Sequence, residues 1–379
     1  MSPLLRRRVA VIGIRGIPAR SGGFETCVEE TAKRLVALGH DVTVYCRRAV
    51  SEERPRTVFG VRCVYVPTIH TKNLSTIVST FFASLHAICT RVEVVHLYVV
   101  GTALFIPLLK LAGKRVVISV DALDWKRKKW SGPASLYLRL AAWMAVRFAD
   151  ELVIDSKVIQ DYYRDRFGRP GAFVPFGANV EPAAGTAAVE SRGLTPGKYV
   201  LFVGVLRPEK QVDKLIRAFT AVQQDAFDLA IVGDDPFERE YEQTLRQLAN
   251  HRVKFLGRIY GPDVIALYQH AYLYVTVSEV EGTSPALLTA MAAGRCVVVN
   301  GIPENLETID DAGLSYPVND IARLSALLTE LFGQPDRVRE YGRRALERVR
   351  RVYDWNAVTG RLARLYDDVC RGTARTEGE

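Results

Sequence analysis

Residues 278–294 have the sequence Ser-Glu-Val-Glu-Gly-Thr-Ser-Pro-Ala-Leu-Leu-Thr-Ala-Met-Ala-Ala-Gly. The apolar run at residues 271–277 comes directly before this segment and predicts a buried strand of a parallel sheet. A glycine, two hydroxyl residues and a proline then mark a helix start, and Gly294 stands where that helix would end. With the apolar residues 296–299, the segment therefore predicts a strand–helix–strand unit of an α/β domain.

Glu281 lies on the turn between the predicted strand and helix. In α/β folds, side chains at the carboxyl ends of parallel strands contact ligands, and the free amides of a helix start favour an anion, most often phosphate. An ordinary turn whose carboxylates face solvent has the same pattern. The residues of this unit leave both interpretations open.

The composition is that of a globular protein with two domains. The chain has 379 residues, of which 48% are hydrophobic and 25% charged, and this length exceeds one ordinary hydrophobic core. Its six cysteines form no CxxC pair and have no metal-ligand spacing with the six histidines. We therefore expect free thiols in a reducing compartment and no metal centre.

Two apolar runs, at residues 75–89 and 97–112, need comparison with membrane spans. Both are shorter than the roughly 20 residues that a span requires. We interpret them as core helices, with shallow membrane contact as the alternative. The basic start of the chain is followed by too short an apolar stretch for a signal peptide, so we expect none.

The formal net charge of the chain is +9. The sequence has no helix-turn-helix, zinc-finger or RNP-like pattern, so we expect no nucleic-acid partner. An anionic membrane surface or a lipid-diphosphate substrate explains the excess of cations, and so does solubility alone.

The N-terminal half opens like a Rossmann domain. Residues 8–13 predict a strand, a glycine-rich loop follows, and residues 24–38 have the apolar spacing of an amphipathic helix. The loop lacks the GxGxxG spacing, and no acidic residue closes the second strand, which argues against a nicotinamide cofactor. Gly22 and Gly23 suit close approach of the backbone to a phosphate or a sugar hydroxyl, although a surface turn has the same composition.

Two α/β series follow one another along the chain. Strand patterns up to residue 175 complete a doubly wound N-terminal domain, and a second series begins at residue 199. We assign residues 1–180 to an N-terminal domain, residues 181–198 to a linker rich in small and turn-forming residues, and residues 199–353 to a C-terminal domain. Residues 356–371 predict a last helix.

Four segments together resemble the retaining glycosyltransferases of family 4. The donor-site motif of that family is similar to Glu-Gly-Thr-Ser-Pro at residues 281–285 and the Ala-Leu-Leu-x-Ala-Met-Ala-x-Gly that follows. The segments at residues 13–26, 120–127 and 302–305 are similar to a bacterial subgroup labelled rhamnosyltransferase-like. The resemblance covers nearly the whole chain. It implies the α/β GT-B fold, with two Rossmann-like doubly wound domains, an interdomain cleft, and a C-terminal crossover helix at residues 356–371 that packs back on the N-terminal domain.

The activity that this resemblance implies is transfer of a hexosyl group, with retention, from a nucleoside-diphosphate sugar to an acceptor hydroxyl. The expected donor is dTDP-rhamnose-like or a UDP-hexose, and the expected acceptor is a glycan or a polyprenyl-diphosphate-linked glycan in cell-surface polysaccharide assembly. Cations and helix amides would stabilise the diphosphate leaving group, so we expect neither a metal nor another cofactor. The implied location is cytoplasmic, at the inner face of the plasma membrane.

The resemblance also assigns roles to side chains. Lys210 matches the lysine that contacts the diphosphate, and Glu281 matches a glutamate that accepts hydrogen bonds from the sugar. The family's arginine usually follows the glycine directly, where this chain has Val205, and we infer that Arg207 replaces it. A solvated loop pair is the alternative for Arg207 and Lys210. The predicted donor-binding residues are Gly22, Gly23, Gly204, Arg258, Gly282, Thr283, Ser284 and Thr289.

Two positions depart from the family pattern. Asp121 stands where many relatives carry a histidine, and we expect it to contact sugar hydroxyls or orient the acceptor, with helix capping as the alternative. Thr289 stands where the family has a second glutamate that binds the ribose. This change predicts weakened binding, a deoxyribose donor such as a dTDP-sugar, or a silent site, and we favour the second.

A basic cluster bracketed by two tryptophans suits a headgroup region or a lipid-diphosphate acceptor, with a solvated helix end as the alternative. It consists of Trp125, Lys126, Arg127, Lys128, Lys129 and Trp130. Two other functions stay open. Val205 and Thr289 are consistent with a catalytically silent binding or assembly subunit. A nucleotide-sugar epimerase would need acid and base carboxylates, for which Asp121 and Asp124 are the candidates.

Overall fold

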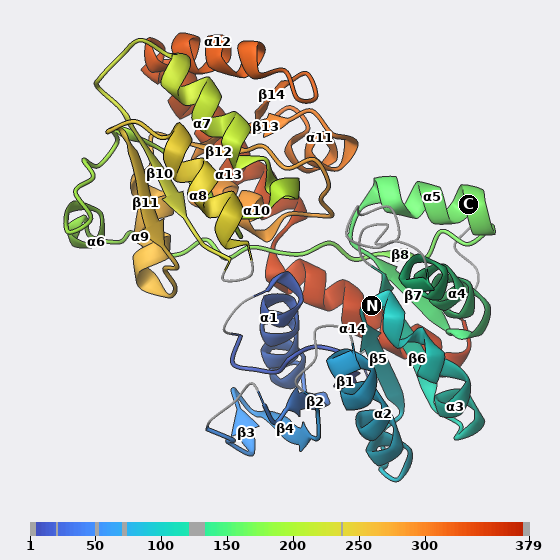
Figure 1. The fold of residues 1–379 in the computed structure, drawn as a ribbon. Coiled ribbons are helices and arrows are strands. Elements are labelled where there is room, and N and C mark those ends of the chain that lie inside the picture. Colours follow the sequence, from blue (N-terminus) through green and yellow to red (C-terminus); the bar gives the residue numbers. More distant parts are fainter. Residues whose placement is uncertain are drawn as a thin grey trace. The chain divides into compact units, whose positions relative to one another are not determined.

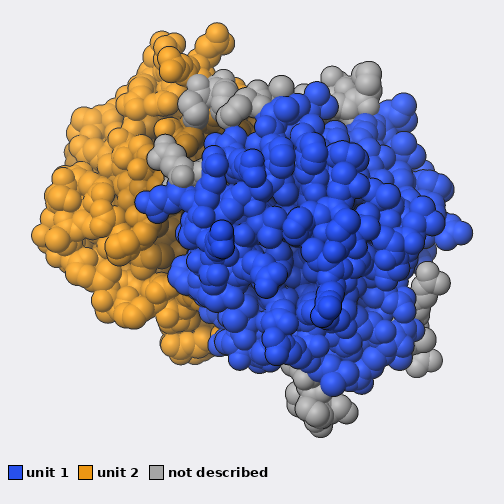
Figure 2. All heavy atoms as spheres, turned by 90° about the horizontal axis from the view of Figure 1, so that it is seen from below, with its two compact units in different colours: residues 1–176, 355–379 blue, residues 177–354 orange. Residues whose placement is uncertain are grey.

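The chain forms two units, each built on its own sheet, which Figure 2 colours separately. Unit 1 comprises residues 1–176 and 355–379, and unit 2 comprises residues 177–354. The computed structural model, drawn in Figure 1, describes residues 5–19, 22–49, 53–69, 74–120, 133–235 and 238–373.

The sheet of unit 1 has the strand order β3-β4-β2-β1-β5-β6-β7-β8. Its strands pair in parallel except β3, which is antiparallel to β4. The central strands are buried and rich in valine and isoleucine, as expected of a sheet covered on both faces. The strands are β1 (Arg8–Ile12), β2 (Asp41–Arg47), β3 (Thr57–Val58), β4 (Val61–Val66), β5 (Val94–Tyr98), β6 (Arg115–Val120), β7 (Glu151–Ile154) and β8 (Ala172–Phe173).

The helices of unit 1 cover both faces of its sheet. The connection from β1 to β2 runs one way along the sheet and the connections from β4 to β8 run the other way, so right-handed crossovers place α1 on one face and α2 to α5 on the other. Helix α14 contacts α1. The helices are α1 (Gly23–Ala37), α2 (Leu74–Ile88), the 3-10 helix η1 (Val100–Phe105), α3 (Ile106–Leu111), α4 (Pro133–Phe148), α5 (Lys157–Phe167) and α14 (Trp355–Arg371).

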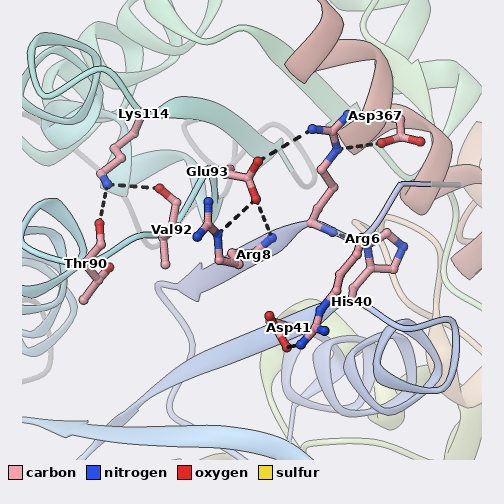
Figure 3. A network of polar contacts seen from close by, with 10 residues as sticks. Arg6, Arg8, His40, Asp41, Thr90, Val92, Glu93, Lys114 and Asp367 are labelled. Atoms are coloured by element: carbon pink, nitrogen blue, oxygen red, sulfur yellow. Dashed lines mark hydrogen bonds and ion pairs between the residues drawn. The ribbon is translucent and has the colours of Figure 1, made fainter.

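A polar network lies at the amino edge of the unit 1 sheet, and its Asp367 belongs to helix α14 (Figure 3). Its Asp367 accepts hydrogen bonds from Nε of Arg7 at 2.6 Å and from the amide of Leu5 at 3.1 Å. Glu93, before β5, is bonded to Nε of Arg8 at 3.2 Å. Nζ of Lys114 donates to the carbonyl oxygens of residues 90 and 92 at 2.7 and 3.0 Å.

Unit 2 has a parallel sheet with the strand order β11-β10-β9-β12-β13-β14. The chain proceeds from β9 outward to β11, then returns to the other side of β9 to form β12, so the strand order reverses between β9 and β12. The strands are β9 (Tyr199–Val203), β10 (Asp228–Val232), β11 (Val253–Gly257), β12 (Leu273–Thr276), β13 (Cys296–Asn300) and β14 (Leu314–Tyr316).

The helices of unit 2 alternate with these strands, and two more follow β14. Helices α7 and α12 pack on each other, and α13 packs on α10 and β13. The helices are α6 (Ala187–Glu190), the 3-10 helix η3 (Pro208–Lys210), α7 (Val212–Ala221), α8 (Arg239–Leu248), α9 (Pro262–His270), α10 (Pro285–Ala292), α11 (Pro303–Ile309), α12 (Ile321–Phe332) and α13 (Pro335–Val352).

Two expectations differ from the structure, and a third is confirmed in part. Residues 181–198, expected as a linker, lie within unit 2, where α6 contacts α9 and the amide of Gly197 bonds the carbonyl of His270 at 2.8 Å. Residues 97–112, expected as one core helix, form the end of β5 followed by η1 and α3. The other apolar run does form helix α2, but that helix exposes Phe81 and Phe82 to solvent. In the described parts of the chain, no helix is long and apolar enough to cross a membrane.

Candidate functional site

Nζ of Lys210 forms an ion pair with Oε1 of Glu281, which joins the loop after β9 to the loop after β12. Both side chains are largely buried, with 20% and 12% of their surface exposed. A second bond joins the same loops, because the amide of Glu279 donates to the carbonyl of Glu209 at 3.1 Å. The pair therefore lies at the carboxyl edge of the sheet where the strand order reverses, which is where open α/β sheets bind ligands.

The N-terminus of α10 follows the loop that carries Glu281. Pro285 occupies its first turn, and no capping hydrogen bond from the side chain of Ser284 is found among the described residues. Thr283 and Ser284 are both buried, with 5% and 7% exposed. The first amides of α10, next to Gly282, are therefore suited to an anion, as helix N-termini are.

Thr289 lies one turn further along α10 and is half-buried. Its hydroxyl donates a hydrogen bond of 2.9 Å to the carbonyl oxygen of Pro285. The hydroxyl hydrogen is thus engaged within the helix, and only the lone pairs of the oxygen remain to accept a bond from a ligand.

Arg207 and Arg258 lie over the ends of β10 and β11. Nε of Arg207 is paired with Oδ2 of Asp235, whose side chain is 3% exposed. Nε of Arg258 is paired with Oδ1 of Asp234, and this hydrogen bond raises the pKa of the guanidinium. The structure therefore holds Arg207 toward the end of β10 by a carboxylate that the sequence analysis did not single out. The sequence did contain a signal for this carboxylate, because Gly233 and two aspartates directly follow a buried strand.

Gly204 is engaged in the backbone of the sheet. Its amide donates to the carbonyl of Val232 at 3.0 Å. A side chain at Gly233, which has φ of 132°, would overlap the carbonyl of Gly204. Gly233 therefore permits close packing of the β9 and β10 ends, and the N–H group of Gly204 is already used within the protein.

Asn300 supports the loop that follows β12, and the sequence analysis also missed this residue. It is fully buried at the end of β13, and its Nδ2 donates to the carbonyl of Ser278 at 3.1 Å. Its Oδ1 accepts from the amide of Asn319 at 3.1 Å, and its carbonyl accepts from Nδ2 of Asn305 at 3.0 Å. The arrangement fixes the start of the segment that carries Glu281.

Gly22 and Gly23 belong to unit 1 and begin α1, where Gly22 has φ of 104°. Two carboxylates of α1 hold the preceding loop: Glu25 accepts from the amide of Arg15 at 3.2 Å, and Glu29 accepts from the amide of Ala19 at 2.6 Å. The Glu25 carboxylate lies beside Gly22, at the end of the helix dipole that favours negative charge.

Part of the predicted site cannot be placed. Asp121 and the basic cluster of residues 125–130 lie outside the described residues. In the ranges that the structure describes, no group of three or more histidine, cysteine, aspartate or glutamate side chains could hold a metal ion.

Residues 197–334 match the family described as "Glycosyl transferases group 1", and residues 6–179 match a family described as a domain of unknown function (DUF1972). The chain is similar to a glycogen synthase of Mycobacterium tuberculosis, with 26% identity over 250 residues, 64% of this chain and 60% of the relative. It is 30% identical over 239 residues to a GDP-mannose-dependent monoacylated alpha-(1-6)-phosphatidylinositol monomannoside mannosyltransferase of Corynebacterium glutamicum, covering 57% of this chain and 61% of that protein. The chain thus spans about 60% of the length of these curated relatives.

Solved structures resemble the chain over nearly its whole length. The sucrose-phosphate synthase of Thermosynechococcus elongatus aligns with a TM-score of 0.83 and 19% identity, over 96% of this chain and 99% of that one. Anabaena Alr3699/HepE, in complex with UDP and glucose, aligns with a TM-score of 0.79 and 17% identity, over 96% and 100% of the two chains. The chain therefore has the two-domain α/β GT-B fold, and its residues 197–334 are similar to the group 1 glycosyltransferases.

Proposed function

We propose that this protein is a metal-independent, retaining glycosyltransferase that moves a hexosyl group from a nucleoside-diphosphate sugar to a hydroxyl of a glycan or lipid-linked acceptor. The single observation that carries the proposal is the Lys210–Glu281 pair at the reversal of strand order in unit 2. This pair brings a cation and a carboxylate, which a sugar diphosphate needs, to the edge where such folds bind ligands.

The chemistry of transfer assigns a role to each partner. As the bond to the sugar breaks, negative charge grows on the diphosphate, and a cation in place beforehand stabilises that charge. In this proposal a bound diphosphate displaces Glu281 from Lys210, so the ammonium contacts phosphate oxygens. The released carboxylate then accepts hydrogen bonds from sugar hydroxyls. The amides at the start of α10 supply further donors to the phosphates.

Arg207 and Arg258 extend the positive charge of this edge. Asp235 and Asp234 hold the two guanidinium groups in the free protein. In the proposed complex Arg207 also faces the diphosphate, with Asp235 fixing its orientation. That Gly22 and Gly23 of unit 1 bind the donor remains a prediction from the sequence.

The donor that we favour is a dTDP-sugar. Thr289 presents one neutral acceptor where a carboxylate would bind two ribose hydroxyls, and a deoxyribose has fewer hydroxyls to hold. Among the relatives, one is named a D-rhamnosyltransferase of Pseudomonas aeruginosa, 29% identical over 161 residues, 41% of this chain and 42% of that protein. We propose a rhamnose-like sugar, a polyprenyl-diphosphate-linked acceptor, and a place at the inner face of the plasma membrane in cell-surface polysaccharide assembly.

The test measures thermal stabilisation and turnover of the purified chain with a panel of UDP-, GDP- and dTDP-sugars. At least one donor should raise the melting temperature and release nucleoside diphosphate when an acceptor is present. Lys210→Met should weaken that donor about tenfold or more, because a charge-assisted hydrogen bond contributes about 1.5–3 kcal/mol. Lys214→Met, four residues further along the chain on α7, is the matched control and should retain the wild-type affinity.

Other outcomes point to the other candidate functions. A silent binding subunit would show neither stabilisation nor turnover with any donor. An epimerase would interconvert free donor sugars without an acceptor. If the Lys210 and Lys214 variants bound the donor equally well, the proposal that the donor binds at the carboxyl edge of the unit 2 sheet would be wrong.

A further inference from the structure

Helices α2, α3 and α4 of unit 1, which Figure 1 labels, expose large apolar side chains to solvent. Leu111 on α3 is 89% exposed, and Leu136 and Trp143 on α4 are 70% and 50% exposed. On α2, the exposed rings of Phe81 and Phe82 contact each other, with centroids 5.4 Å apart. We call this surface the α2–α4 face; its other exposed apolar members are Leu74, Leu85, Leu108, Leu140 and Phe148.

The three helices form one continuous surface. Helix α3 contacts α4, and η1 contacts both α2 and α4, all on the same side of the sheet. On α4 the exposed apolar positions Leu136, Leu140 and Trp143 are spaced by four and three residues, so they form one stripe along the helix. An amphipathic helix of a soluble domain normally presents polar residues on that stripe. Exposed apolar side chains gathered on neighbouring helices are typical of an interaction site.

The charge of the α2–α4 face has one sign. The residues of α2, η1, α3 and α4 include no aspartate or glutamate, while Lys110, Arg139 and Arg147 are cations. Among the described residues, Glu93 follows α2 and pairs with Arg7 and Arg8, and Asp150 follows α4 and pairs with Lys110 and Arg115. The charge of the face therefore comes from Arg139 and Arg147 on α4. Arg91 also follows the C-terminal end of α2, and Lys114, which follows α3, donates hydrogen bonds to backbone carbonyls.

We propose that the α2–α4 face docks on an anionic lipid bilayer and lies in its interface without crossing it. Apolar side chains enter the headgroup boundary, and the arginines bind the lipid phosphates, as in interfacial amphipathic helices. A second copy of the chain fits less well, because two such faces would bring Arg139 and Arg147 together with no carboxylate to pair them. This inference adds a membrane-binding surface to the proposed function. It rests on that proposal only in the assumption that the acceptor is linked to a lipid.

The test is co-sedimentation of the full chain with vesicles of phosphatidylcholine alone or mixed with phosphatidylglycerol. The wild-type chain should bind the mixed vesicles, and binding should weaken as salt is raised. The variant Leu111→Gln/Leu136→Gln/Trp143→Gln should lower the partition coefficient by at least about tenfold. Arg139→Gln/Arg147→Gln should remove most of the preference for the anionic lipid. Leu38→Gln/Val318→Gln changes two side chains that are 49% and 51% exposed outside this face, and it should bind as the wild type does.

Two further measurements keep the result unambiguous. Circular dichroism and the donor-induced thermal shift, taken without lipid, should be the same in the triple variant and the wild type. Loss of vesicle binding with intact donor binding therefore supports this inference, whereas absence of donor binding in both proteins counts against the proposed function alone. The inference is overturned if the wild type ignores anionic vesicles or the triple variant binds them as tightly. It is also overturned if light scattering finds a dimer that the triple variant dissociates.

Discussion

Nδ1 of His96 lies 2.7 Å from the hydroxyl oxygen of Tyr366, and Nε2 of the same ring lies 2.8 Å from the hydroxyl oxygen of Ser119. The contact joins β5 to α14, so the C-terminal helix is bonded to the centre of the unit 1 sheet. A neutral imidazole has one donor and one acceptor, and the two hydroxyls satisfy both. Burial lowers the pKa of His96 to about 3, so the ring is neutral in the folded protein.

This burial makes the stability of unit 1 depend on pH. An unfolded histidine has a pKa of about 6.5, so between pH 6.5 and 3 the unfolded chain takes up a proton that folded His96 does not. The contribution of the neutral ring is complete above pH 6.5 and is lost as the pH falls, by up to about 1.4 kcal/mol per pH unit. His96→Gln should flatten the dependence of the unfolding free energy on pH between 6.5 and 4.5 in urea titrations. His251→Gln, at an exposed position, is the control, and equal slopes in the two variants would contradict the assignment.

The close approach of β9 and β10 predicts that Gly233 cannot be replaced. Gly233→Ala combines φ of 132° with an overlap between the new Cβ and the carbonyl oxygen of Gly204. We expect a loss of about 3 kcal/mol or more in the free energy of unfolding. Gly197 also has positive φ, of 73°, but nothing lies within 4 Å of its added Cβ. Gly197→Ala should therefore cost only about 1 kcal/mol, and a chemical denaturation series that ranks the two variants equally would refute the packing argument.

Asn300 should support both stability and the donor site. Asn300→Ala leaves the carbonyl of Ser278 and the amide of Asn319 without their partners in a fully buried position. Such a change costs about 2–4 kcal/mol, and each kcal/mol lowers the melting temperature of a unit of this size by about 2–4 °C. The loop that carries Glu281 also loses its support, so the donor-induced thermal shift should fall. Ser315→Ala, on the exposed side of β14, should leave both melting temperature and donor shift unchanged.

Much of the fold follows from a local pattern. Apolar runs of strand length predicted both sheets, because a parallel strand buried on both faces needs such a run. The glycine, hydroxyl residues and proline at residues 282–285 predicted the helix that follows Glu281. Residues 97–112 show where the pattern fails. The apolar content there is continuous, but Val99 takes φ of 72°, which ends β5 and starts a 3-10 helix. No local preference predicts this conformation for a valine, because it depends on the packing around it.

Part of the candidate site could likewise be predicted from the sequence, and part could not. Glu281 could be predicted from its place on the turn between a strand and a helix, and Lys210 was assigned from the family resemblance. The two lie together because their loops follow parallel strands, whose carboxyl ends share one edge. Asp235 as the partner of Arg207 could not, because their pairing depends on β9 and β10 being neighbours, a property of the strand order. Asn300 was missed for a related reason, since its bonds run to residues 22 and 19 positions away in the chain.

Thr289 gives the sharpest test of donor preference. Its hydroxyl is bonded to the carbonyl of Pro285 and can offer a ligand only acceptor capacity. Thr289→Glu introduces a carboxylate that can accept from both ribose hydroxyls, and a charged acceptor contributes about 1.5–3 kcal/mol against about 1 for a neutral one. UDP- and GDP-sugars should therefore bind about tenfold more tightly to this variant, and dTDP-sugars should gain less. Thr289→Gln, of the same length but neutral, controls for size, and calorimetric titrations of the three nucleotides measure the differences. Weaker binding of every donor to Thr289→Glu would mean that position 289 does not face the ribose.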